Sequence, residues 1–260
     1  MLDLERLNRI RLTDDPIGQK IVATALLMPN YRLPPRVTIE LEHAERIPDE
    51  SVIYAMNHTD RYNYWPFQYQ LWREMGRFTA TWVKGKYYEN ELLAWFMEQM
   101  NNIPTVSRGY LIAKDFAATV GRPPNNEEYK ALRGEVDRVA GVRDADAADL
   151  PALEDVPGEV LEQPRNVLGV PFDPTQTSYP DYINELFQTM MRRFVDLNYE
   201  AMRKGLDLLI FPQGTRSIRL SKGRIGLAQI ALHARKTVVP VGCSGSDEVY
   251  PGSSPIGRGG

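Results

Sequence analysis

Short apolar runs of five or six residues recur along the chain and are separated by longer segments with helical periodicity. The runs contain β-branched and aromatic side chains, a composition typical of buried strands. They cover residues 51–56, 78–83, 206–211 and 237–241. A fifth segment, residues 37–41, alternates apolar and polar side chains and predicts an exposed strand.

Helical patterns fill the segments between these strands. They cover residues 64–75, 91–101, 180–204 and 222–235, and an apolar helix over residues 17–28 is expected to stop at Pro29. Strands that alternate with helices indicate an α/β fold with a mostly parallel sheet flanked by helices. We expect this sheet to form the main domain, residues 35–260, which follows an N-terminal helical segment, residues 1–34, in the chain.

One part of the main domain, residues 110–178, has a different composition. It holds 7 basic and 13 acidic residues, a balance of 7 − 13 = −6, whereas the rest of the chain sums to −3 − (−6) = +3. Its prolines interrupt every long helical pattern except one around residues 126–140. The segment is predicted to be an acidic insertion, either a mobile lid or a solvated surface elaboration without function.

Composition then narrows the class of protein. The chain has 260 residues, of which 43% are hydrophobic and 25% charged, as in ordinary globular proteins. A net charge of −3 argues against a nucleic-acid partner. Cys243 is the only cysteine and the three histidines lie far apart, so neither a disulfide nor a metal site is expected, and a reducing cytoplasmic compartment fits best.

Contact with a membrane is expected at its surface only. Residues 1–12 alternate charges with leucines and lack the apolar core of a signal peptide, and the longest uncharged apolar stretch, residues 21–28, is too short to span a bilayer. Tryptophan and tyrosine are concentrated in residues 62–96, which contain all four tryptophans. These rings favour the membrane interface, but they also pack well in a core, so both interpretations remain open.

A histidine follows the first predicted buried strand. The segment Asn57-His58-Thr59-Asp60-Arg61-Tyr62-Asn63 begins directly after residues 51–56. Ligand sites gather at the carboxyl ends of strands in open α/β sheets, and a histidine there can remove a proton from an alcohol or a thiol. Its other ring nitrogen needs a partner, for which Asn63 and Asp60 are candidates; the alternative is a purely structural histidine.

A second polar segment, Phe211-Pro212-Gln213-Gly214-Thr215-Arg216-Ser217, follows the strand over residues 206–211. Glycine permits close backbone approach, threonine offers a hydroxyl group, and arginine offers a planar cationic fork. Together they suit a phosphate or a carboxylate. A tight turn with a solvated Arg216 is the alternative.

The two segments together resemble the glycerolipid acyltransferase superfamily, which includes 1-acylglycerol-3-phosphate and glycerol-3-phosphate O-acyltransferases. Asn57-His58 matches the family's N-H-x4-D block, and Phe211 to Ser217 matches F-P-E-G-T-R-S except at Gln213. Residues 103–108 (IPTVSR) are similar to the I-P-V-x-R block, with Lys84 at its lysine position, and residues 239–241 match V-P-V. The blocks occur in the family order and extend over residues 35–108 and 180–243.

The resemblance implies a peripheral protein on the cytoplasmic face of a phospholipid membrane, with an acyltransferase-type αβ fold and a seven-stranded sheet. His58, with Asn63 or Asp60, would act as general base on a hydroxyl of a lysophospholipid or glycerol phosphate. That hydroxyl would attack the thioester of acyl-CoA or acyl carrier protein without a metal or bound cofactor. Substrate-binding residues would be the following: Gln213, Gly214, Thr215, Arg216, Arg108 and Lys84.

Two departures from the family pattern suggest an alternative function. Asn63 replaces the family's aspartate and Gln213 its glutamate, so the chain is either an active enzyme or a silent homologue that binds acyl or phospholipid ligands. A hydrolase that uses His58 with a serine is disfavoured because the sequence has no G-x-S-x-G elbow. Residues 17–28 and the tryptophan-rich region are expected to touch lipid, and an apolar groove to hold the acyl chain.

Overall fold

The computed structural model describes residues 1–142 and 153–257, and part of the predicted acidic insertion, residues 143–152, therefore lies outside the described residues. Contacts divide the chain into two compact units. Unit 1 comprises Met1–Ile10, Lys84–Ala94 and Pro104–Phe194. Unit 2 comprises Arg11–Val83, Trp95–Ile103 and Val195–Gly260.

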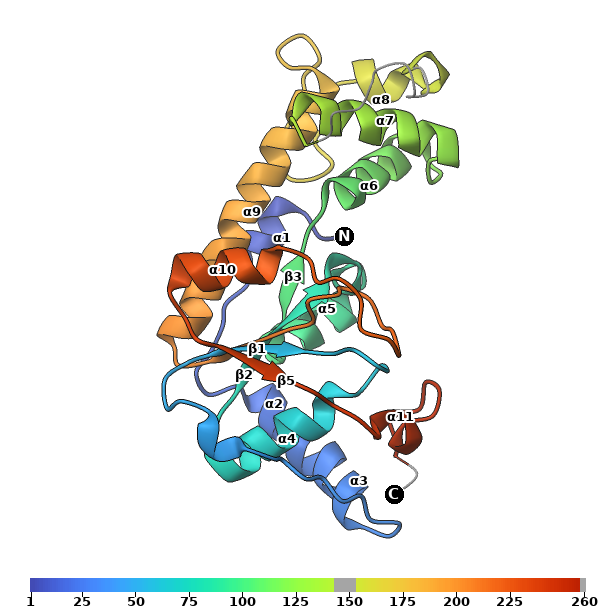
Figure 1. The fold of residues 1–260 in the computed structure, drawn as a ribbon. Helices are drawn as coiled ribbons and strands as arrows, with labels where there is room; N and C mark the ends of the chain where they lie inside the picture. The colour runs from blue at the N-terminus through green and yellow to red at the C-terminus, as the bar shows by residue number, and fades with distance from the viewer. Residues whose placement is uncertain (143–152, 258–260) are drawn as a thin grey trace. The chain divides into compact units, whose positions relative to one another are not determined.

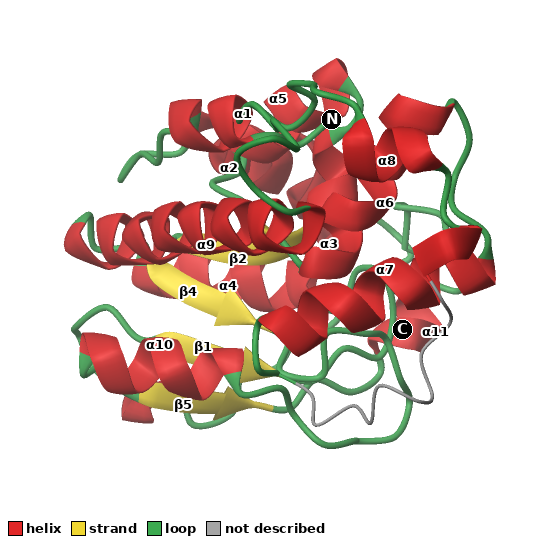
Figure 2. Cartoon of the chain, turned by 90° about the horizontal axis from the view of Figure 1, so that it is seen from above, coloured by secondary structure: helices red, strands yellow, loops and turns green. Residues whose placement is uncertain are grey.

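An all-parallel sheet with the strand order β3-β2-β4-β1-β5 organises the α/β fold, and helices flank it (Figure 2). The strands are β1 (Ile53–Met56), β2 (Thr79–Lys84), β3 (Ile103–Thr105), β4 (Asp207–Ile210) and β5 (Val238–Val241). β1 lies between β4 and β5, with Ile53 opposite Leu208 and Val238. The four strands predicted from apolar runs are observed as β1, β2, β4 and β5. The prediction that all four are buried is wrong for β5, which lies at the edge of the sheet and alternates between exposed and half-buried residues. The described residues form five strands where the family resemblance implied seven.

Helices alternate with these strands along the chain (Figure 1). They are α1 (Leu4–Arg9), α2 (Ile17–Ile21), α3 (Met28–Arg32), α4 (Tyr64–Met75), α5 (Glu91–Gln99), α6 (Arg108–Val120), α7 (Asn126–Val139), α8 (Gly158–Glu162), α9 (Tyr179–Arg203), α10 (Gly226–Ala234) and α11 (Ser246–Val249). The predicted helix over 64–75 has the observed bounds, and those over 91–101, 126–140, 180–204 and 222–235 correspond to α5, α7, α9 and α10.

Two sequence predictions are wrong. Residues 37–41 form no strand, because their backbone bonds go elsewhere: the Val37 amide donates to the Tyr31 carbonyl, and the Ile39 carbonyl accepts from Gln70 Nε2. The N-terminal helix does not stop at Pro29. A π-helical turn, Val22–Leu27, joins α2 to α3, and Pro29 lies in the first turn of α3, where its missing amide hydrogen is tolerated.

Apolar packing in unit 2 holds α4 against the sheet. Tyr54 and Met56 of β1 are buried with Phe67 and Leu71 of α4, and the Tyr54 and Phe67 rings meet edge to face at 4.9 Å. The helix ends at Gly76, whose left-handed φ of 65° closes the last turn. These contacts fix the segment between β1 and α4, which carries His58.

The tryptophan-rich segment divides between core and surface. Trp65 and Trp72 pack against a buried cluster that includes Tyr31 and Tyr69, and Trp82 donates a hydrogen bond to Asn198 at 2.7 Å. Trp95 is 58% exposed on α5. Core packing therefore accounts for most of these indoles. None of the helices in the described part of the chain is both long and apolar enough to cross a bilayer.

Candidate active site

Two loops meet at the carboxyl ends of neighbouring parallel strands in unit 2 (Figure 2). His58 lies just beyond β1, and Phe211 follows β4 directly. The Ser217 amide donates a hydrogen bond of 2.8 Å to the His58 carbonyl. The two segments that the sequence singled out are therefore joined by their backbones at one edge of the sheet.

His58 is held by a side chain and by an aromatic ring. Its Nδ1 lies 3.0 Å from Asn63 Oδ1, and its imidazole stacks on Phe211 with a centroid distance of 4.1 Å. Asn63 is fully buried, and its Nδ2 donates to the Asn57 carbonyl at 2.7 Å, so Oδ1 faces the imidazole. Nδ1 is then the donor to Asn63, and this tautomer leaves the imidazole lone pair on Nε2.

Asp60, the other candidate partner of the histidine, has a different role. Its Oδ1 accepts from the Tyr62 amide at 2.7 Å, and its Oδ2 accepts from the hydroxyl groups of Thr59 and Ser246. Because Ser246 begins α11, the Asp60 carboxylate ties the histidine turn to the segment that follows β5. Of the two candidates, Asn63 makes the contact with His58.

Asn57 has a structural role that the sequence analysis did not assign to it. Its side chain clamps the backbone of Cys243: Nδ2 donates to the carbonyl at 2.8 Å, and Oδ1 accepts from the amide at 2.7 Å. The Cys243 thiol donates to the Asn63 carbonyl, and burial raises the pKa of this thiol. Its position next to His58 in the sequence motif was the available signal. A protonated thiol in this setting serves as packing rather than as a nucleophile.

The second loop turns sharply at Gly214. The φ of Gly214 is 70°, and its amide donates to the Phe211 carbonyl at 2.9 Å. The positive φ favours glycine at this position, and a Cβ atom there would also lie 3.2 Å from Arg224 Nε, close enough that the arginine side chain would have to shift. Thr215 and Arg216 are exposed, which leaves their polar side chains accessible to an anionic ligand.

Arg224 is a second cation beside this turn, and the sequence assigned it only to the start of a helix. Its amide donates to the Pro212 carbonyl at 2.8 Å, and its guanidinium covers Gly214. The signal for it was the composition of residues 208–246, which contain six Lys or Arg residues and no Asp or Glu. An anion at Gly214 would therefore face positive charge from Arg224, while Arg216, two residues further along the loop, is exposed to solvent.

The buried side chain of Gln213 binds residues later in the same loop. It is 7% exposed, and its Nε2 donates to the Arg219 carbonyl at 3.1 Å and to the Ser221 hydroxyl at 3.2 Å. Its Oε1 is buried without a hydrogen-bond partner. The amide nitrogen thus orders the backbone of residues 217–221, while the role of Gln213 in substrate binding stays a prediction.

The two remaining predicted site residues belong to unit 1. Lys84 is the exposed last residue of β2. Arg108 is the first residue of α6; its Nε donates to Asn184 Oδ1 at 2.6 Å, and its guanidinium lies 4.3 Å from the Phe187 ring centroid. Burial lowers the pKa of Arg108. These contacts anchor Arg108 within unit 1, and substrate binding by either residue stays a prediction.

A small apolar pocket lies behind the first turns of α4. Its lining includes Val22 and Leu27 of the π-helical turn, Trp65 and Trp72 of α4, and Phe78. Among the described residues, no group of three or more His, Cys, Asp or Glu side chains is arranged to hold a metal ion.

Comparison of the chain with known protein families, curated proteins and solved structures gave no match.

Proposed function

We propose that this protein is an O-acyltransferase of the glycerolipid acyltransferase type. It moves a fatty acyl group from acyl-CoA or acyl carrier protein to a hydroxyl of a lysophospholipid or glycerol phosphate. The observation that carries the proposal is the pairing of His58 and Asn63, joined through the Ser217 amide to the loop of Gly214 and Arg216. A general base and an anion-binding loop are the two elements that such a transfer needs.

In this reaction His58 Nε2 removes the proton from the acceptor hydroxyl as its oxygen attacks the thioester carbonyl. The tetrahedral intermediate collapses with cleavage of the carbon–sulfur bond, and the imidazolium returns the proton to the leaving thiolate. No acyl-enzyme forms. Asn63 accepts from Nδ1 throughout, which holds the reactive tautomer but adds no compensating negative charge.

The surroundings of this pair fit a phosphate headgroup. Arg216 and Arg224 supply cationic donors on the loop of Gly214. The small apolar pocket lined by Trp65 and Trp72 offers too little room for an acyl chain, although α4, which lines it, begins directly after Asn63.

Peripheral association with the cytoplasmic face of a membrane belongs to the same proposal. Ile17 and Ile21 are 65% and 58% exposed on one face of α2, and Trp95 is exposed on α5. α2 and α5 touch, because a Cβ on Gly18 would collide with the Gln99 backbone. Exposed aliphatic and indole side chains on adjoining helices support contact with a lipid interface.

A thiol-release assay with long-chain acyl-CoA or acyl carrier protein tests the proposal across lysophosphatidate, glycerol-3-phosphate and other lysolipids. We expect acceptor-dependent release that His58→Ala lowers by about 10²–10⁴-fold, the usual contribution of a general base. His233→Ala, at an exposed histidine of α10, is the matched control and should keep the parent rate. Release that ignores both the acceptor and His58 contradicts the proposal.

The substitutions at Asn63 and Gln213 favour one second candidate, a silent homologue that binds acyl or phospholipid ligands. The same assay separates the two functions. Saturable binding of acyl-CoA or lysolipid without thiol release from either donor would support the silent homologue.

A further inference from the structure

The loop between β4 and α10 carries positive charge and bare aliphatic side chains beyond the candidate site. Ile218, Leu220 and Ile225 are 89%, 82% and 71% exposed. Arg219 and Lys222 lie among them and are exposed as well. We call residues 218–225 the basic–apolar loop.

These side chains are exposed because hydrogen bonds from Gln213 and Ser217 hold the backbone of the loop. The Arg219 carbonyl accepts from the Ser217 hydroxyl at 2.7 Å and from Gln213 Nε2 at 3.1 Å. The Ser217 hydroxyl also accepts from the Arg219 amide at 3.2 Å. With the Arg219 backbone bound on the inner side, the neighbouring Ile218 and Leu220 side chains point to solvent.

Local charge on this segment is of one sign. The stretch of residues 208–246 contains no Asp or Glu, although the whole chain has a net charge of −3. Basic side chains mixed with exposed aliphatic ones match the two layers of an anionic bilayer, since the cations meet the headgroups and the aliphatic groups enter the acyl region. A protein partner would need a complementary groove for each aliphatic side chain, whereas a bilayer accepts them without a fixed shape.

We propose that the basic–apolar loop docks this protein on anionic phospholipid membranes. This assignment deepens the proposed function, because a lipid acceptor in the bilayer would reach Gly214 and His58 along a loop that begins at the site. It places the membrane contact at the carboxyl ends of the strands rather than on α2, whose Gln19 binds the Thr79 carbonyl at the amino end of β2. It does not depend on turnover, since binding to a membrane is measured separately from acyl transfer.

Vesicle flotation with the full chain tests the inference, using phosphatidylcholine vesicles with and without phosphatidylglycerol. Each cation near an anionic surface contributes about 5-fold in binding, so Arg219→Gln with Lys222→Gln should lose about 25-fold on the anionic vesicles only. Ile218→Ser with Leu220→Ser should weaken binding to both kinds of vesicle. Thermal melts confirm that each variant folds.

The matched control is Arg73→Gln with Lys204→Gln, which removes two exposed cations elsewhere in unit 2 and should bind like the parent. An equal loss in this control, no binding by the parent, or parent-like binding by both loop variants overturns the inference. The inference is also overturned if the two loop variants bind vesicles like the parent but no longer bind an acidic acyl carrier protein, because the loop would then serve a protein partner.

His58→Ala separates this inference from the proposed function. It should lower turnover by about 10²–10⁴-fold and leave vesicle binding unchanged. Loop-dependent binding by a protein that shows no acyl transfer would leave the docking surface standing and remove the enzyme. Acyl transfer to soluble glycerol-3-phosphate without loop-dependent binding to vesicles would support the enzyme and remove the docking surface.

Discussion

At Asn63 and Gln213 the chain carries amides where the glycerolipid acyltransferase pattern has carboxylates. Each amide nitrogen donates to a backbone carbonyl, Asn63 to Asn57 and Gln213 to Arg219. A carboxylate cannot donate, and in either position it would place negative charge against a carbonyl oxygen. The two departures therefore fit the backbone of this chain, and Asn63 still offers His58 an acceptor.

Gln213→Glu is expected to destabilise unit 2. The substitution removes two donated hydrogen bonds and adds a carboxylate at a site that is 7% exposed. A carboxylate buried at this position without donors of its own lowers the free energy of unfolding by at least about 1–3 kcal/mol. Urea denaturation measures this loss. Gln229→Glu, on the exposed side of α10, is the control and should change the free energy by less than about 0.5 kcal/mol. Equal effects of the two substitutions would contradict the role of Gln213.

At the scale of elements, the one long helical pattern that prolines leave intact in residues 110–178 predicted a helix around residues 126–140, which is α7. α7 begins with a capping box, in which Asn125 accepts from the Glu128 amide and Glu128 accepts from the Asn125 amide. The two bonds satisfy backbone amides that the start of a helix leaves without partners. Helical periodicity missed α6 and the apolar runs missed β3, since residues 110–120 were counted with the insertion and β3 is only three residues long.

The first turn of α7 should loosen in acid. Hydrogen bonds from Arg122 lower the pKa of Glu128 to about 2, helped by the Asn125 amide. The folded pKa is below the unfolded value of about 4.3, so the stabilisation is full above that pH and is lost as the pH falls toward 2. Amide exchange over residues 125–132 between pH 5 and 2 measures this change.

Glu128→Gln should remove most of that pH dependence. Glu127→Gln is the control, because Glu127 is an exposed neighbour in the same turn that pairs with Lys130. If α7 frays identically in both variants and in the parent across this range, the Glu128 carboxylate does not support the helix.

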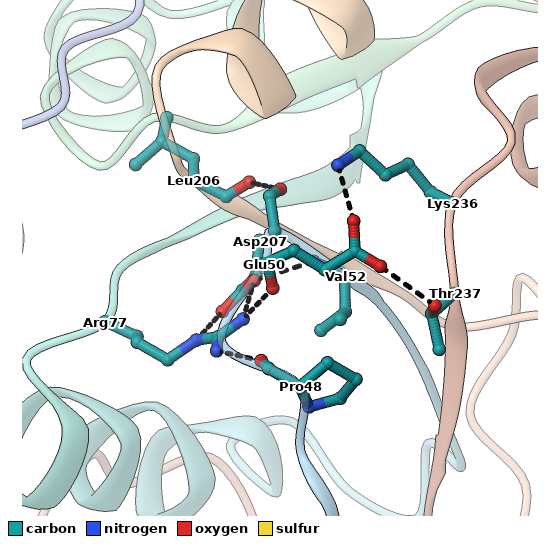
Figure 3. Close-up of polar contacts among 9 residues, drawn as sticks. Pro48, Glu50, Val52, Arg77, Leu206, Asp207, Lys236 and Thr237 are labelled. Carbon is teal, nitrogen blue, oxygen red and sulfur yellow. Dashed lines mark hydrogen bonds and ion pairs between the residues drawn. The ribbon is translucent and has the colours of Figure 1, made fainter.

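At the scale of the whole molecule, a polar cluster joins the amino ends of three strands, at the edge of the sheet away from His58 (Figure 3). Asp207, the buried first residue of β4, accepts from Arg77 Nε at 2.8 Å and from the Val52 amide at 3.0 Å. Glu50 bridges to β5 through Lys236 and Thr237, and these contacts lower the pKa of Glu50. The cluster therefore ties together the amino ends of β1, β4 and β5, and the two loops of the candidate site follow the carboxyl ends of β1 and β4.

Asp207→Ala should destabilise unit 2 by about 3–5 kcal/mol, because it leaves the Arg77 guanidinium and the Val52 amide without their buried partner. Thermal and urea unfolding measure the change. Glu50→Gln is the control, and its effect should be much smaller because the Glu50 pair with Lys236 is exposed to water. Comparable losses of unfolding free energy in the two variants would show that the buried pair of Asp207 and Arg77 stabilises unit 2 no more than the exposed pair does.

The sequence by itself determined the elements whose signal is local. Apolar runs marked four of the strands, helical periodicity marked α4 and α9, and the residues around His58 and Gly214 predicted polar loops at strand ends. Residues 37–41 alternate like a strand, yet they lie outside the sheet because their backbone groups bond to the Tyr31 carbonyl and the Gln70 side chain rather than to a strand. Local pattern specifies which face of a segment is apolar, but not which partner covers it.

Tertiary structure alone decided which groups meet. The choice of Asn63 over Asp60 depends on the Asn57 carbonyl and on Ser246, and the place of Arg224 depends on the turn at Gly214. The bond from Ser217 to His58 exists because β1 and β4 are neighbours in the sheet. Hydrogen bonds have a reach of about 3 Å, so contacts between residues far apart in the chain follow from strand order rather than from spacing in the sequence.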